Sequence, residues 1–172
     1  ELAFKQEDLK INGHALEVRV YAEDPLANFM PSIGTLSVYE TPVGDGIRVD
    51  DGFEEGMEVP IHYDPMISKL ITYGKNREEA IQLMIKAIDN YQVEGVATTL
   101  SFGKFVCEHE AFTSGNFDTH FVKNYYAPEH LEKRYAEERR IAALVALKLY
   151  LENDQTLKIP TKVSSNWQKG RV

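Results

Sequence analysis

The segment from Gly13 to Pro25 constrains the fold most, because its apolar and polar side chains alternate. Three apolar residues alternate with an acid, a base and a phenol, in the order Leu16, Glu17, Val18, Arg19, Val20, Tyr21. Successive side chains of a strand point to opposite faces, so the apolar three share one face and the polar three share the other. This pattern is typical of a half-solvated antiparallel strand. One face builds a core, and the other is either ordinary surface or faces a ligand.

Short β-rich segments follow, and glycines separate them. The predicted strands cover residues 14–22, 35–39, 47–50, 57–62 and 66–73. This spacing indicates an antiparallel sheet.

The second half of the chain is predicted to be helical. Asn76 has the character of an N-cap, and Glu79 three residues later completes the spacing of a capping box before an apolar pattern that runs to Tyr91. Further helices are predicted over 99–107, from about Thr119, and from Pro128 onward. The predicted fold class is therefore α+β, with an antiparallel sheet packed against C-terminal helices and a helical extension.

Three regions follow from this pattern: a domain over 1–126, a helical extension over 127–153 and an extended tail over 154–172, anchored at most by Trp167. The extension is apolar nearly all round between Ile141 and Leu151, so this half of the helix has to be buried. Packing into the core and docking against a missing domain are both open interpretations.

Charge and cysteine content exclude several classes of protein. The 172 residues carry a net charge of −8, which argues against nucleic-acid and anionic-membrane partners. No apolar run approaches the length of a membrane span. Cys107 is the single cysteine, which excludes an internal disulfide and fits a reducing, cytoplasmic setting. Because the chain begins at Glu1 without a methionine, we expect a domain cut from a longer protein.

No self-contained active site is visible in the sequence. The Gly-Asp-Gly turn at 44–46 lacks the lysine of a phosphate loop, and the five histidines have no metal-ligand spacing. No base adjoins a serine or Cys107, so nucleophilic catalysis is not predicted. No metal site is predicted either.

A series of ordered motifs nevertheless resembles the C-terminal domain of biotin carboxylases over residues 1 to about 125. The sequence GHALEVRVYAEDP, followed by NFMPSIG, is similar to the GHAxExRxxAEDP and F-x-P-S-x-G blocks of that family. The matching blocks are residues 13–25, 28–34, 46–50, 63–71, 73–80 and 116–121.

The resemblance implies part of an ATP-dependent ligase that carboxylates biotin on a carrier domain with bicarbonate. It also implies that ATP and Mg or Mn are bound mainly by upstream N-terminal and ATP-grasp domains, so that the fragment alone is inactive. The implied partners are those domains, a biotin carboxyl carrier, a carboxyltransferase and a second copy in a homodimer. The extension past Tyr126 favours an acetyl-CoA or propionyl-CoA carboxylase involved in fatty acid metabolism. The alternative is a non-catalytic dimerisation or carrier-docking module.

The resemblance also assigns residues. Arg19 matches the family arginine that faces biotin, and it is the predicted catalytic residue. Asp64 is expected on the biotin side, where it would orient Arg19, and we rank Glu17 below it for this role. An aspartate before a proline also accepts turn hydrogen bonds, which is an equally open interpretation of Asp64. Arg48 matches a dimer-interface arginine, but Asp45 stands where a dimeric relative has an aromatic side chain, which puts the same dimer in doubt.

Thr119 and His120 match a segment at the edge of the ATP pocket. For His120, a histidine hydrogen-bonded ahead of a helix is an equally good interpretation.

Overall fold

The computed structural model describes residues 2–60 and 64–152, and the chain divides into two compact units. The first unit extends to Arg134 and contains every described strand together with helices α1 to α4. The second begins at Tyr135 and, in its described part, is the rest of helix α5 (Pro128–Glu152). The predicted tail and Trp167 lie outside the described residues, and the boundary at residue 126 stays a prediction.

The centre of the first unit is an antiparallel sheet of β1 (His14–Tyr21), β8 (Met66–Gly74) and β6 (Ile47–Asp51), in the order β1-β8-β6. All three strands lie where the sequence predicts them, to within one residue at their ends. The alternation in β1 is confirmed, because Val20 is fully buried while Glu17 and Arg19 are exposed.

Three smaller antiparallel pairs surround this sheet. They are β2 (Glu23–Asp24) with β3 (Met30–Pro31), β4 (Gly34–Thr35) with β7 (Glu58–Val59), and β5 (Val38–Glu40) with β9 (Gln92–Glu94).

The prediction of one strand over 35–39 is wrong, because this segment changes partner midway. The amide of Leu36 donates to the backbone carbonyl of Met57, whereas the amide of Ser37 donates to the backbone carbonyl of Glu94. The strand predicted over 57–62 is shorter, and residues 61–63 lie outside the described part.

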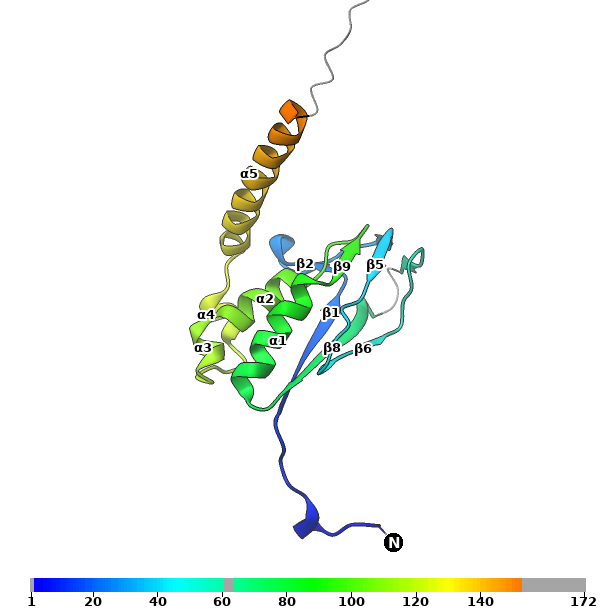
Figure 1. The fold of residues 1–172 in the computed structure, drawn as a ribbon, viewed down its shortest axis with the longest axis vertical. Helices are drawn as coiled ribbons and strands as arrows, with labels where there is room; N and C mark the ends of the chain where they lie inside the picture. Colours follow the sequence, from blue (N-terminus) through cyan, green and yellow to red (C-terminus); the bar gives the residue numbers. More distant parts are fainter. Residues whose placement is uncertain (1, 61–63, 153–172) are drawn as a thin grey trace, which may run out of the picture. The chain divides into compact units, whose positions relative to one another are not determined.

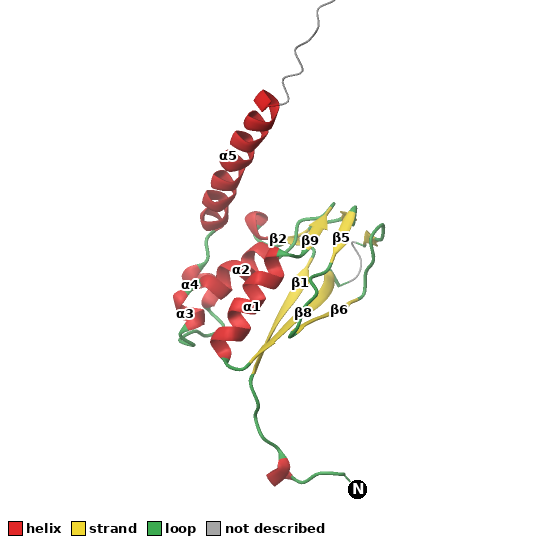
Figure 2. Ribbon diagram, viewed as in Figure 1, coloured by secondary structure: helices red, strands yellow, loops and turns green. Residues whose placement is uncertain are grey.

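Helices α1 (Arg77–Asp89) and α2 (Leu100–Glu108) lie side by side along one face of the sheet, as Figures 1 and 2 show. Leu70, Met84 and Val20 form the centre of the core between them. Gly103 lets α2 approach β1, since a Cβ there would lie only 3.3 Å from Cγ1 of Val18. The prediction of a sheet packed against helices is confirmed in this unit.

The start of α1 departs from the predicted capping box in one contact. Oδ1 of Asn76 accepts from the amide of Glu79 at 2.9 Å, which confirms the N-cap. The Glu79 carboxylate accepts from the amide of Lys75 instead of that of Asn76, because Lys75 is the residue whose N–H lies within reach, at 3.0 Å.

Beyond α2, a short helix α3 (Glu110–Thr113) that the sequence did not predict precedes α4 (Phe121–Tyr125). The segment is held by an aromatic cluster around Phe105, whose ring contacts those of Phe102, Phe121, Tyr126 and His130. Aromatic pairs at these separations stabilise packing beyond the area that they bury.

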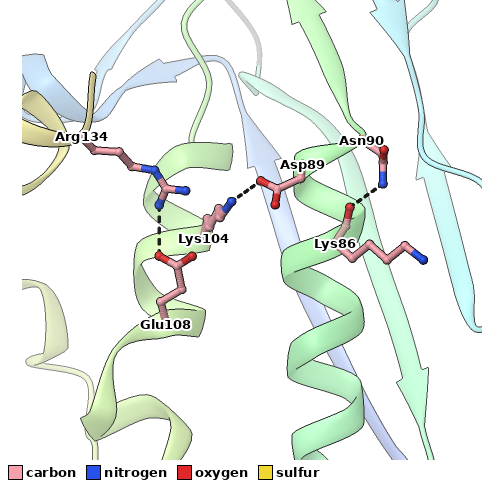
Figure 3. A network of polar contacts seen from close by, with 6 residues as sticks. All are labelled: Lys86, Asp89, Asn90, Lys104, Glu108 and Arg134. Atoms are coloured by element: carbon pink, nitrogen blue, oxygen red, sulfur yellow. Dashed lines mark hydrogen bonds and ion pairs between the residues drawn. The ribbon is translucent and has the colours of Figure 1, made fainter. Parts of the chain in front are cut away.

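Polar contacts connect the helices of the first unit, as Figure 3 shows. Lys104 of α2 pairs with Asp89 of α1, and Arg134 in the second turn of α5 pairs with Glu108 of α2 at 3.0 Å. Leu131 is 1% exposed. The first turns of α5 are therefore anchored to α2.

The later part of α5 has a different character. Its apolar side chains, from Ile141 to Leu151, are between 51% and 73% exposed, and they are Ile141, Leu144, Val145, Leu147, Leu149, Tyr150 and Leu151. Burial in a core, one of the two interpretations of this segment, is not found among the described residues. No described helix is long and apolar enough to cross a membrane.

Candidate functional site

The open face of the β1-β8-β6 sheet, opposite α1 and α2, carries the charged side chains of the candidate site. The register places Arg19, Lys69 and Asp50 in one row across the three strands. The next row is Glu17, Ile71 and Arg48. This arrangement follows from the two-residue period of each strand, which turns the apolar partners toward the helices.

Arg19 is held by its neighbours on β1. Its Nε lies 3.5 Å from Oε1 of Glu17, and its side chain is 60% exposed. A hydrogen bond with Tyr21, and after it the interaction with Glu17, raises the pKa of the guanidinium further above its usual value. Arg19 is thus a permanent cation that is both anchored and accessible.

Thr99 fixes the backbone of β1 next to Arg19. Its Oγ1 accepts from the amide of Tyr21 at 3.0 Å and donates to the carbonyl of Arg19 at 3.3 Å. Its own amide donates to the carbonyl of Tyr21. The sequence predicted only a helix start at this residue, and its long-range role has no local signal.

Asp64 makes the contact that its turn interpretation expects, and its place on the biotin side stays a prediction. Oδ1 of Asp64 accepts from the amide of Met66 at 2.9 Å, which is the turn interpretation. The ion-pair partner of Arg19 in the structure is Glu17, and the ranking of Asp64 above Glu17 on the biotin side stays a prediction. Asp64 does lie near the end of β1, because burial and, after it, the charge of Asp64 raise the pKa of Glu23.

Arg48 lies on the same open face, on β6, which β8 separates from β1. Its Nη2 bonds Oδ2 of Asp50 at 3.1 Å, and its side chain is 70% exposed. Asp45 is exposed in the turn before β6. Such surface is available to a partner, and no described residue covers it.

Thr119 and His120 lie apart from this face, immediately before α4 on the helical side of the unit. The amide of His120 donates to Oδ1 of Asp118, and its Nδ1 lies 3.4 Å from Oδ2. These contacts match the interpretation of a hydrogen-bonded histidine ahead of a helix. Within this chain, the structure does not bring them together with Arg19.

A cavity of about 410 Å³ lies between β1 and α2. Its walls are mainly apolar, and Arg19 and Glu23 belong to its lining. Phe29 closes one side, with a φ of 58° that bulky residues rarely adopt. Its ring meets that of Phe102 edge-on at 5.0 Å. Phe29 belongs to a recognised motif, but the sequence had not singled it out.

Two kinds of chemistry find no support in the described residues. Burial raises the pKa of the Cys107 thiol to about 11, which leaves it protonated and unreactive. No group of three His, Cys, Asp or Glu side chains in the described part is placed to hold a metal ion. The resemblance places Mg or Mn mainly in upstream domains, and no described residue is assigned to a metal.

Comparison with known proteins identifies the family of this chain. Residues 17–124 match the family model of the biotin carboxylase C-terminal domain. Biotin carboxylase 1 of Bacillus subtilis is 47% identical over 125 residues, covering 73% of this chain and 28% of that protein. The mitochondrial propionyl-CoA carboxylase alpha chain of Sus scrofa is 44% identical over 141 residues, covering 81% of this chain and 19% of that one.

A solved structure of a biotin carboxylase domain is also similar to this chain. The biotin carboxylase domain dimer of the Hydrogenobacter thermophilus 2-oxoglutarate carboxylase, in complex with MgADP, ADP and bicarbonate, has a TM-score of 0.71 and 37% identity over 73% of this chain and 29% of that one. The chain therefore belongs to the biotin carboxylase C-terminal domain family. It spans less than a third of the length of these relatives.

Proposed function

We propose that this chain forms the biotin-facing wall of a site at which biotin on a carrier is carboxylated with ATP and bicarbonate. The observation that carries the proposal is Arg19, an accessible cation held on the open face by Glu17 and Tyr21. Removing a proton from biotin develops negative charge on its ureido oxygen. A preorganised guanidinium stabilises such charge better than a hydrated lysine does.

The ATP-dependent step is assigned to other parts of the intact enzyme. The described residues offer no metal cluster, and Thr119 and His120 would supply only the edge of a nucleotide pocket. The carrier and the carboxyltransferase are the proposed partners in the whole enzyme. A cytoplasmic location stays a prediction.

We further propose that the parent enzyme is an acyl-CoA carboxylase. A match covering 81% of the 172 residues has to extend past the first turns of α5, wherever it begins, and the Sus scrofa propionyl-CoA carboxylase alpha chain has such a match. The match to the Bacillus subtilis biotin carboxylase covers 73% of the chain and does not have to reach α5. The choice between acetyl-CoA and propionyl-CoA depends on the carboxyltransferase.

The test is carboxylation of biotin by the intact parent enzyme with Arg19→Ala. Loss of one donor to a developing oxyanion costs about 3 kcal/mol of barrier, so we expect turnover to fall by about a hundredfold or more. Lys75→Ala, which changes a cation in the turn after β8, is the matched control and keeps its activity. Near-normal turnover in Arg19→Ala would overturn the proposal.

The second candidate function is a dimerisation or carrier-docking module, and a variant of Arg48 distinguishes it from the first. Its 70% exposed side chain on the same face favours an interface there. If assembly is the main function, Arg48→Glu dissociates the enzyme, and Arg19→Ala impairs association instead of turnover. Sedimentation of both variants separates the two candidates.

A further inference from the structure

Arg77, the first residue of helix α1, contacts three other parts of the first unit. Its Nη2 donates to the backbone carbonyl of Phe112 in α3, and its Nη1 lies 3.4 Å from Nε2 of His14 at the start of β1. The guanidinium also lies 4.7 Å from the ring centroid of Phe112 and 5.9 Å from that of Phe117. Aromatic rings attract cations at such distances. Arg77 therefore joins α1 to β1, to α3 and to the loop that contains Phe117.

The local structure of α1 does not account for a cation at this position. The N-terminus of a helix carries a partial positive charge, so the guanidinium of Arg77 is unfavourable in the first turn. Its Nε is buried and makes no hydrogen bond among the described residues, which adds a desolvation cost. The long-range contacts offset these two costs, so the role of Arg77 lies in what the guanidinium holds in place.

The guanidinium is bonded to the turn that ends α3. The carbonyl of Phe112 accepts from the amide of Gly115 at 3.1 Å as well as from Arg77. Gly115 has a φ of 79°, a conformation that residues with a side chain rarely adopt. Arg77 thereby fixes the point from which the chain leaves α3.

Residues 116–120 lead from this turn to the start of α4. All of their hydrogen bonds, in the part of the chain that the structure describes, join positions at most four apart. The ring of Phe117 packs against a ring of α3 with centroids 4.9 Å apart and lies within reach of the Arg77 guanidinium. The position of Thr119 and His120 relative to α1 therefore depends largely on Phe117 and Arg77.

We propose that Arg77 is a positioning residue for the nucleotide, because it holds the loop that carries Thr119 and His120. The inference rests on the proposed function, which places these two residues at the edge of the ATP pocket. A planar guanidinium suits the role, since it donates to a carbonyl and lies over aromatic rings at the same time. Without it, ATP binding would have to order the loop, at a cost in affinity.

Steady-state kinetics of the intact parent enzyme test this role. Arg77→Met should raise the KM for ATP by about five- to tenfold. The kcat and the KM for bicarbonate should change little, because the loop contacts ATP equally in the ground state and the transition state. Arg134→Met is the matched control. It removes a guanidinium that pairs with Glu108, away from the loop, and should leave the KM for ATP unchanged.

Phe117→Leu tests the same contact from the side of the loop. The Phe117 side chain is 45% exposed, so this change should disturb the folded unit little while the KM for ATP again rises. A double-mutant cycle with His120→Ala then separates positioning from a merely structural role. If Arg77 acts through His120, Arg77→Met raises the KM for ATP by less than about twofold in the His120→Ala background.

A second measurement uses the 172-residue chain and needs no enzymatic activity. NMR relaxation of the backbone amides of residues 116–120 reports how well these residues are ordered. Arg77→Met should lower their order parameters and leave those of α1 and α2 unchanged. Arg134→Met should leave the order parameters of residues 116–120 as in the wild type.

Three results would contradict the inference. They are an unchanged KM for ATP in both Arg77→Met and Phe117→Leu, an equal rise of this KM in Arg134→Met, and unchanged order of residues 116–120 in Arg77→Met. A full effect of Arg77→Met in the His120→Ala background would also count against it. Arg19→Ala is measured in the same assay. If it loses turnover while Arg77→Met behaves as the wild type, the proposed function stands and only the role of Arg77 fails.

Discussion

Thr99 fixes the backbone at the end of β1, the strand that carries Arg19. Its hydroxyl and amide make three hydrogen bonds with the backbone of Arg19 and Tyr21. Thr99 is 7% exposed and directly precedes α2. The residue at the start of α2 therefore fixes the backbone of β1 at Arg19, whose side chain lies on the open face.

Thr99→Val should lower the free energy of unfolding by about 1–3 kcal/mol, because it keeps the shape but leaves buried backbone groups of β1 without their partner. Urea denaturation measures the loss. Thr98→Val is the control, since Thr98 is less buried and makes no comparable contact among the described residues. Equal losses in both variants would mean that the hydroxyl of Thr99 contributes little.

Glu17→Gln should hardly change stability, because both members of its pair with Arg19 are largely exposed. Such surface pairs contribute about 0–1 kcal/mol. If Glu17 positions Arg19, the variant lowers kcat of the parent enzyme with little effect on the melting temperature, and Glu17→Asp restores part of it. Unchanged kcat would leave Tyr21 as the residue that orients Arg19.

Tyr91→Phe should destabilise the first unit by about 1–3 kcal/mol. The Tyr91 hydroxyl lies 2.7 Å from both the Tyr39 hydroxyl and Oγ of Ser68, and burial raises its pKa well above the usual range. Removing the Tyr91 hydroxyl leaves the buried Ser68 hydroxyl without this hydrogen-bond partner. Tyr73→Phe, which loses one exposed bond to Asn12, is the control and should cost less, as thermal denaturation would show.

Cys107 should make the protein less stable in alkali. The thiol of the unfolded chain ionises near pH 9, whereas burial raises the pKa of the folded one to about 11. Between these values the unfolded state releases its proton and the folded state keeps it, so stability falls as pH rises through this window, by up to about 2 kcal/mol. Below pH 9 the effect is absent.

Guanidinium denaturation at a series of pH values, compared between the wild type and Cys107→Ala, measures this contribution. A steeper alkaline loss in the wild type is expected. As a second check, native Cys107 should react slowly with a thiol reagent at pH 8 and rapidly after unfolding. Rapid reaction of the native protein would contradict the burial of this side chain.

The amino-acid sequence by itself determined the features that depend on local geometry. The alternation from Leu16 to Tyr21 determines which side chains of β1 face the core, because a strand has a period of two residues. The side chain of Asn76 starts α1 through a contact only three residues away. The ordered motifs around Arg19 also indicated the family before any contact was known.

The tertiary structure decided which residues meet across the sheet and between elements. Lys69 stands opposite Arg19 because of the pairing register of β1 and β8, and Thr99 reaches β1 from about eighty positions along the chain. Pairing of Arg19 with Glu17 in place of Asp64 likewise depends on side-chain positions in the folded sheet. The contacts of Lys69 and Thr99 with β1 join residues far apart in sequence, so no local pattern encodes them. Arg19 and its neighbours on the same strand, Glu17 and Tyr21, were visible from the sequence, whereas its cross-strand neighbours became visible only when the strands were paired.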